Sequence, residues 1–328
     1  MKKLLWVLIL LLLPLTALAE DAESRRDGAF FYQIADGEAV LTGCDWDAMQ
    51  ADSLYMFAEP PVSLEIPATL GGYPVTSIGG GVFCSLDGCP VDAPFEVVLP
   101  EGLRTLDAYT FTECFYATKI TLPASLTGIS AHMFENCEGL VTVTVPEGLL
   151  EIGDSAFAGC KKLENCALPP NLTRVGSYAF DKCTLWNAEL LPDTLTEIGE
   201  YAFRQCKKLT EVTIGEKLLN VGEGAFYDCD GIKKVDWQAK VTRIPDRVFQ
   251  SCYYIETVKL PETVTEIGEY SFYSCGYLTD IGTFERMKRI GACAFSNCDE
   301  LVNIGTLDAI EEILSLIHIS EPTRPISI

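Results

Sequence analysis

The stretch Cys206-Lys-Lys-Leu209-Thr-Glu-Val212-Thr-Ile214-Gly-Glu-Lys-Leu218-Leu-Asn-Val221-Gly222-Glu-Gly-Ala225-Phe226 is one period of a repeat that fills most of this 328-residue chain. Its phenylalanine recurs every 23 residues from Phe111 to Phe295, and Phe83 precedes Phe111 by 28 residues. Such a fixed period is typical of solenoids, in which each repeat buries its apolar side chains against its neighbours. The sequence therefore predicts one long stacked core and favours a binding function.

The first half of each period, Leu-x-x-Val-x-Ile, predicts a short strand because its apolar residues alternate. Two core positions recur in these strands. The first is filled by Leu163, Leu209, Ile232, Ile255 and Leu278, and the second by Ile120, Val143, Val212, Val235 and Val258.

The second half, Leu-x-x-Ile-Gly-x-x-Ala-Phe, predicts a turn, or one turn of helix or 3₁₀-helix, that carries Ala-Phe into the core. Its glycine is interpreted as a residue with positive φ, at Gly153, Gly176, Gly199, Gly222, Gly268 and Gly291. The predicted fold class is a repeat solenoid, mainly β or α/β, that forms a right-handed coil with one short strand and a turn or short helix per repeat.

The full motif Leu-x-x-Ile-Gly-x-x-Ala-Phe-x-x-Cys resembles that of the BspA-like leucine-rich-repeat proteins, which are bacterial surface antigens. The resemblance covers nearly all of residues 64–313. It implies an exported bacterial protein, secreted or held at the cell surface, whose concave strand face mediates adhesion by binding an extracellular protein or glycan.

Four segments are predicted along the chain. Residues 1–19 form a secretory signal peptide, with Lys2-Lys3, an apolar run and Ala17-Leu-Ala19 before the cleavage site. Residues 20–63 form an N-terminal capping segment, and residues 64–313 form the leucine-rich-repeat solenoid. Residues 314–328 break the repeat and resemble a translated adapter used in preparing DNA sequencing libraries, which predicts a non-native tail.

The net charge of −23 narrows the class of partner. The sequence contains no basic run, which argues against nucleic acids and anionic lipids as partners. No membrane insertion is expected after signal cleavage. An acidic exterior favours neutral or cationic partners, or serves to keep the protein soluble.

Nine of the 14 cysteines follow the repeated phenylalanine by three residues, from Cys114 to Cys298. They are predicted to form a column of buried thiols, because side chains that leave successive coils in the same direction are poorly placed for disulfides. No metal site is expected, since Cys-x-x-Cys pairs and nearby histidines are missing. In the irregular 28-residue interval, Cys84 and Cys89 either form a local disulfide or do not, and the sequence leaves both alternatives open.

No catalytic residue, cofactor or metal is predicted. The chain has two histidines, of which His318 lies in the predicted tail, and His132 has neither a nucleophile nor an orienting carboxylate placed beside it by the repeat.

A binding surface is predicted on the strand residues that face away from the core. The candidate residues are Lys119, Thr121, Thr142, Thr144, Asn165, Glu211, Thr213, Lys234, Asp236, Thr257, Lys259 and Asp280. Trp237 stands at an inward position, which favours a role in core packing. The alternative function is a non-catalytic spacer or accessory module of a larger surface protein or enzyme that is truncated after Ile313.

Overall fold

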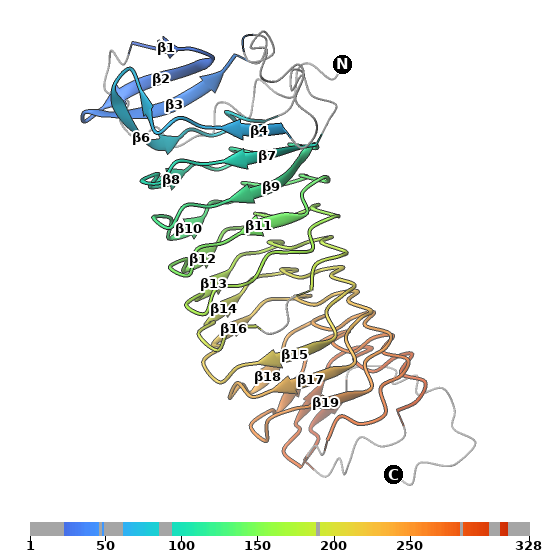
Figure 1. Ribbon diagram of the computed structural model, residues 1–328. Coiled ribbons are helices and arrows are strands. Elements are labelled where there is room, and N and C mark those ends of the chain that lie inside the picture. Colours follow the sequence, from blue (N-terminus) through green and yellow to red (C-terminus); the bar gives the residue numbers. More distant parts are fainter. Residues whose placement is uncertain are drawn as a thin grey trace, which may run out of the picture.

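The computed structural model of this chain is a solenoid of stacked coils (Figure 1). It describes residues 23–45, 48, 62–84, 94–187, 191–282, 285–301 and 309–313. The mainly β form of the predicted solenoid is confirmed. The predicted signal peptide and the predicted tail lie outside the described residues.

The first side of the coils carries the strands that the Leu-x-x-Val-x-Ile pattern predicts. They pair in parallel. Partners on β4 and β7 are 33 residues apart, whereas nearly all partners on the later strands are 23 apart, as in the pairs Glu211–Lys234 and Lys234–Thr257. These strands are β4 (Val62–Glu65), β7 (Phe95–Val98), β9 (Ala117–Thr121), β11 (Thr142–Thr144), β15 (Glu211–Ile214), β17 (Lys234–Trp237) and β19 (Thr257–Lys259).

The second side carries further short strands, so the prediction of one strand per repeat was incomplete. Each has two residues and ends at the apolar residue of the return half, which in six of these ten strands is followed by Gly. Most of them form two parallel sheets. They are β8 (Thr105–Leu106), β10 (Gly128–Ile129), β12 (Glu151–Ile152), β13 (Arg174–Val175), β14 (Glu197–Ile198), β16 (Asn220–Val221), β18 (Arg243–Ile244), β20 (Glu266–Ile267), β21 (Arg289–Ile290) and β22 (Glu312–Ile313). Two residues are too few to show the alternation by which a strand is recognised in a sequence.

The N-terminal end of the stack is covered by an antiparallel unit of β1 (Arg25–Asp27), β2 (Phe30–Ala35) and β3 (Glu38–Cys44). Strand β3 pairs with β6 (Tyr73–Ile78), which pairs in turn with β5 (Thr69–Leu70) and with β8. Tyr32 and Leu41 are buried in the common core. This unit pairs the edge of β6, while β4 remains the terminal strand of its own sheet among the described residues. An unpaired sheet edge can otherwise invite association.

The third side of each coil consists of turns, and the expected turn of helix or 3₁₀-helix is not found in the described residues. In the coil around Phe157, the amides of Ser155, Phe157 and Gly159 donate to carbonyl oxygens of the next coil, at 2.7–2.8 Å. The intervening amides of Ala156 and Ala158 close turns within their own coil.

This alternation requires left-handed backbone at two positions per coil. Ser155 has φ +53° and Gly159 has φ +79°, and the equivalent residues of most other coils are also left-handed although few are glycine. A left-handed non-glycine residue is disfavoured in isolation. Here it directs backbone donors to the neighbouring coil, so the inter-coil hydrogen bonds offset the strain.

The recurrence of glycine at one repeat position has a different cause from the one predicted. The residues concerned are Gly153, Gly176, Gly199, Gly222, Gly268 and Gly291. None of the six has positive φ. A Cβ added at Gly153 would lie 2.6 Å from the backbone nitrogen of Ala131 and 2.9 Å from the carbonyl oxygen of Ile129. These glycines are needed because the backbones of adjacent coils approach too closely to leave room for a side chain.

The core is a column of phenylalanine rings. Ten rings from Phe83 to Phe295 are buried, and adjacent centroids lie 5.1–5.8 Å apart with interplanar angles of 2–20°. Trp186 adds a buried ring that stacks on Phe180 at 4.3 Å. The two predicted core positions of the strands are also buried, as the alternation predicted.

Candidate functional site

The outward side chains of β4, β7, β9, β11, β15, β17 and β19 form a surface that we call the strand face. All 12 predicted binding residues are described, and they form two groups. Strands β9 and β11 place Thr142 beside Lys119 and Thr144 beside Thr121, and Asn165 continues this group through a bridge to Thr142. The other seven lie on or next to β15, β17 and β19.

Charged residues on the strand face pair between adjacent coils. Lys119 Nζ lies 3.1 Å from a carboxylate oxygen of Glu96, and Lys234 Nζ lies 3.4 Å from one of Glu211. Lys259 Nζ lies 3.7 Å from Asp236. The side chains of Lys234 and Lys259 remain 63% and 82% exposed. Exposed pairs of this length contribute little stability, so the lysines are available to a partner.

Trp237 does not contribute to the strand face, because its ring is 2% exposed and packs edge-on against Phe249. Its predicted role in core packing is confirmed. Its buried Nε1 has no hydrogen-bond partner within the described residues. The ring borders a shallow depression of about 360 Å³ on the opposite, second side of the coils.

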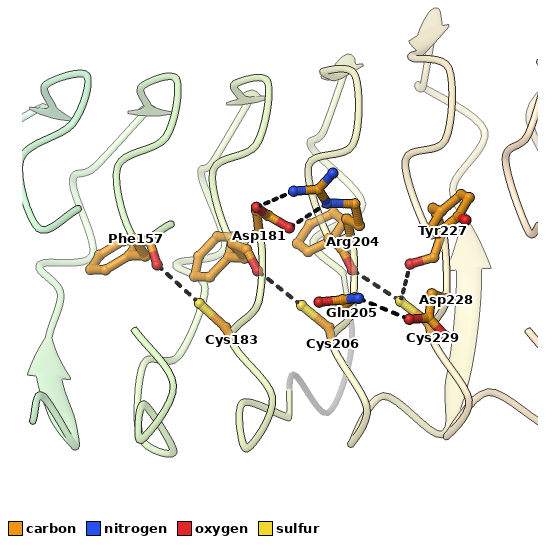
Figure 2. A network of polar contacts seen from close by, with 11 residues as sticks. Phe157, Asp181, Cys183, Arg204, Gln205, Cys206, Tyr227, Asp228 and Cys229 are labelled. Carbon is orange, nitrogen blue, oxygen red and sulfur yellow. Dashed lines mark hydrogen bonds and ion pairs between the residues drawn. The ribbon is translucent and has the colours of Figure 1, made fainter. Parts of the chain in front are cut away.

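The predicted cysteine column is confirmed, and the structure adds a hydrogen-bond ladder to it. Each Sγ donates to the carbonyl oxygen of the phenylalanine in the preceding coil, as Figure 2 shows for Cys183, Cys206 and Cys229, at 3.1, 3.2 and 2.9 Å. The whole ladder runs through Cys114, Cys137, Cys160, Cys183, Cys206, Cys229, Cys252, Cys275 and Cys298. The thiols thus fill space and also satisfy buried carbonyl groups. The Cys84–Cys89 disulfide stays a prediction, because Cys89 lies outside the described residues.

Burial makes these thiols unreactive. Desolvation raises the pKa of Cys298 to about 12 and holds the pKa values of Cys183 and Cys206 well above the ordinary range. The predicted inert Cys166 is likewise buried, and desolvation raises its pKa to about 12. A thiol reacts as the thiolate, which Cys166, Cys183, Cys206 and Cys298 do not form near neutral pH.

We expect native protein treated with iodoacetamide at about pH 8 to be alkylated at half-buried Cys293 and to stay unmodified at Cys183, Cys206 and Cys275. Denaturation should make all of them react. Peptide mass spectrometry locates the modified residues. Alkylation of Cys183 as fast as Cys293 in folded protein would contradict the buried ladder.

Another network in Figure 2 joins coils at the surface. Arg204 binds Asp181 with two hydrogen bonds of 2.6 Å. Its guanidinium also lies 5.5 Å from the ring centroid of Tyr178 and 5.8 Å from that of Tyr201. The hydrogen bonds to Asp181 raise the pKa of Arg204. This arrangement fixes adjacent coils and offers no free reactive group.

His132 lies on the third side of its coil. Its ring stacks on Tyr109 with centroids 4.6 Å apart, and Nδ1 lies 2.8 Å from a carboxylate oxygen of Glu135. The prediction that no carboxylate lies beside His132 was therefore wrong, because the turn places the residue three positions later next to the ring. Over the described parts of the chain, no three His, Cys, Asp or Glu side chains are grouped to hold a metal ion.

A cluster of exposed aromatic side chains was missed by the sequence reasoning. Tyr253, Tyr254 and Tyr277 are 44%, 49% and 48% exposed, and their ring centroids lie 5.2–5.5 Å apart. They occupy the two positions after the ladder cysteines, where the coil turns into its strand. The sequence does contain a signal for this cluster. Most coils carry charged or small residues at these two positions, so the tyrosines depart from the repeat pattern.

Comparisons with known proteins agree with this geometry. The sequence model of the family described as BspA type leucine rich repeat region (6 copies) matches residues 76–191 and 186–302, which is more than half of the chain. No curated protein matches the sequence. Among the described residues, no helix has the length and apolar character needed to cross a membrane.

The solved structures that are similar to this chain include the following three. The pneumococcal vaccine antigen PcpA aligns with a TM-score of 0.55 and 19% identity, over 88% of this chain and 71% of that chain. A leucine-rich repeat protein from Eubacterium ventriosum ATCC 27560 aligns with a TM-score of 0.51 and 17% identity, over 88% of this chain and 91% of that chain. A leucine rich cell surface protein from Faecalibacterium prausnitzii A2-165 has a TM-score of 0.36 and 20% identity, over 89% of this chain and 96% of that chain. At these identities the first two show a shared fold alone.

Proposed function

Because this chain belongs to the BspA-type leucine-rich-repeat family, we propose that it is a bacterial cell-surface protein that binds an extracellular protein or glycan through its strand face. No catalytic role is part of this proposal. Solenoids present extended surfaces on which many contacts add up, and this form suits a macromolecular partner.

The observation that supports the proposal is the exposure and weak ion pairing of the lysines on β17 and β19. On the parallel strands β17 and β19, Lys234 lies opposite Thr257 and Lys259 lies opposite Asp236. Both lysines are largely exposed, and their ion pairs to Glu211 and Asp236 are long, at 3.4 and 3.7 Å. A partner can replace such pairs with little loss of stability, and charged groups at an interface guide both association and specificity.

The test is a screen of the protein, without its predicted signal peptide, against extracellular-matrix proteins and glycans. Lys234→Glu and Lys259→Glu should each weaken binding to the partner found, by about tenfold, because each reverses a charge at the interface. Surface plasmon resonance measures the dissociation constants.

Lys161→Glu is the matched control. Lys161 is also an exposed lysine paired to the preceding coil, 2.7 Å from Glu138, but it lies outside the strand face. Binding that both strand-face variants leave intact, or that Lys161→Glu weakens equally, would contradict the proposal. Failure of every panel member to bind would favour the alternative of a spacer or accessory module.

A further inference from the structure

The three exposed tyrosines precede the strand-face residues of their coils in the sequence, and we call them the tyrosine rim: Tyr253, Tyr254 and Tyr277. Aromatic groups of this size are normally at least partly covered in a soluble protein, and tyrosines are frequent anchors at binding surfaces. Each of these rings leaves nearly half of its surface open to solvent. The rim is therefore a candidate site for contact with another molecule.

The rim is held rigidly by its own packing. The ring of Tyr253 meets Tyr254 at an interplanar angle of 84° and Tyr277 at 79°. The amide of Tyr277 donates to the carbonyl oxygen of Tyr253 at 3.1 Å, which fixes the two coils. Gly276 makes room for the rings, since a Cβ at this position would overlap the ring of Tyr253. A preorganised aromatic surface loses little conformational entropy when a ligand binds.

In the segments that contain the rim and in the segment that follows it, all charged residues are acidic. Residues 253–257, 276–280 and 299–301 contain the carboxylates of Glu256, Asp280, Asp299 and Glu300 and no lysine or arginine. Backbone hydrogen bonds place Glu256 beside Thr279 and Glu300 beside Gly276, so acids lie on the same coils as the rings or on the next one. A basic residue, Lys233, lies in the preceding coil, where its carbonyl oxygen accepts a hydrogen bond from the amide of Glu256.

We propose that the tyrosine rim is a docking site for a basic polypeptide segment that presents arginine or lysine side chains. A cationic group is attracted to the face of an aromatic ring, and the four carboxylates add charge complementarity. The protein uses the same contact internally, where Arg247 lies 5.3 Å from the ring centroid of Tyr270. The net charge of −23 further draws cationic partners toward the surface.

The probe is a fluorescently labelled peptide that alternates arginine with glycine, titrated with the full chain and followed by fluorescence anisotropy. The double variant Tyr254→Ala/Tyr277→Ala should weaken binding about tenfold, whereas Tyr254→Phe/Tyr277→Phe should retain it, because phenylalanine keeps the aromatic face. Glu300→Lys should also weaken binding. Matched peptides with glutamate or serine in place of arginine should bind far less.

Tyr116→Ala is the control for the repeat position, since Tyr116 is exposed and lies six periods before Tyr254. It should leave binding unchanged, and so should Lys234→Glu, which separates this site from the strand face. Equal weakening by Tyr116→Ala and the double variant would assign binding to the acidic surface in general and overturn the proposal. A preference of the rim for neutral oligosaccharides or for the glutamate peptide would overturn it as well.

Discussion

Phe203→Ala is expected to lower the free energy of unfolding by about 3–5 kcal/mol, the usual range when a buried phenylalanine is truncated. The Phe203 ring is fully buried and has neighbours on both sides, with centroids 5.6 Å from Phe180 and 5.3 Å from Phe226. Trp186 also stacks on it, at 5.6 Å. Removal of the ring leaves a cavity, and the backbone cannot close it because each coil is hydrogen-bonded to the coils on both sides.

Urea denaturation followed by circular dichroism measures this effect. The control is Phe115→Ala, which removes the same side chain from a position that is 41% exposed and should change stability by less than about 1 kcal/mol. Similar losses for the two variants would mean that the ring column is not the main stabilising element of the stack.

Gly153→Ala is expected to destabilise the protein by about 1–3 kcal/mol or more, as overpacking does in a close-packed interior. The added methyl group would meet backbone atoms of residues 129–131 at 2.6–2.9 Å, and backbone cannot move aside as a flexible side chain can. The amide of Gly153 donates to the carbonyl oxygen of Ile129 at 2.8 Å, so separation of the two coils would also stretch this hydrogen bond.

Gly148→Ala tests the same chemical change five residues earlier. A Cβ at Gly148 meets no atom within 4 Å, and its φ is not positive. This variant should be neutral or stabilising by about 0.4–1 kcal/mol, because alanine restricts the unfolded chain. Thermal melts of the two variants are sufficient to compare them. Equal melting temperatures would show that the coils can separate to admit a methyl group.

Much of the fold could be predicted because a strict period repeats each local signal many times. The alternation at Val212, Val235 and Val258 predicted buried strand positions, and the column of Phe and Cys followed from the constant spacing. The binding surface was predictable only as the set of outward positions. The tyrosine rim was overlooked because Tyr253 and Tyr277 are exposed neighbours only once their coils are stacked.

The sequence by itself determined the solenoid, its period and its core, because burial of apolar side chains at fixed intervals permits few other arrangements. Only the tertiary structure decided the second set of strands, the left-handed residues such as Ser155, and the reason for glycine at Gly153. These features depend on the distance and hydrogen bonds between coils. A contact between backbones of adjacent coils has no signature in the side chains of a single repeat.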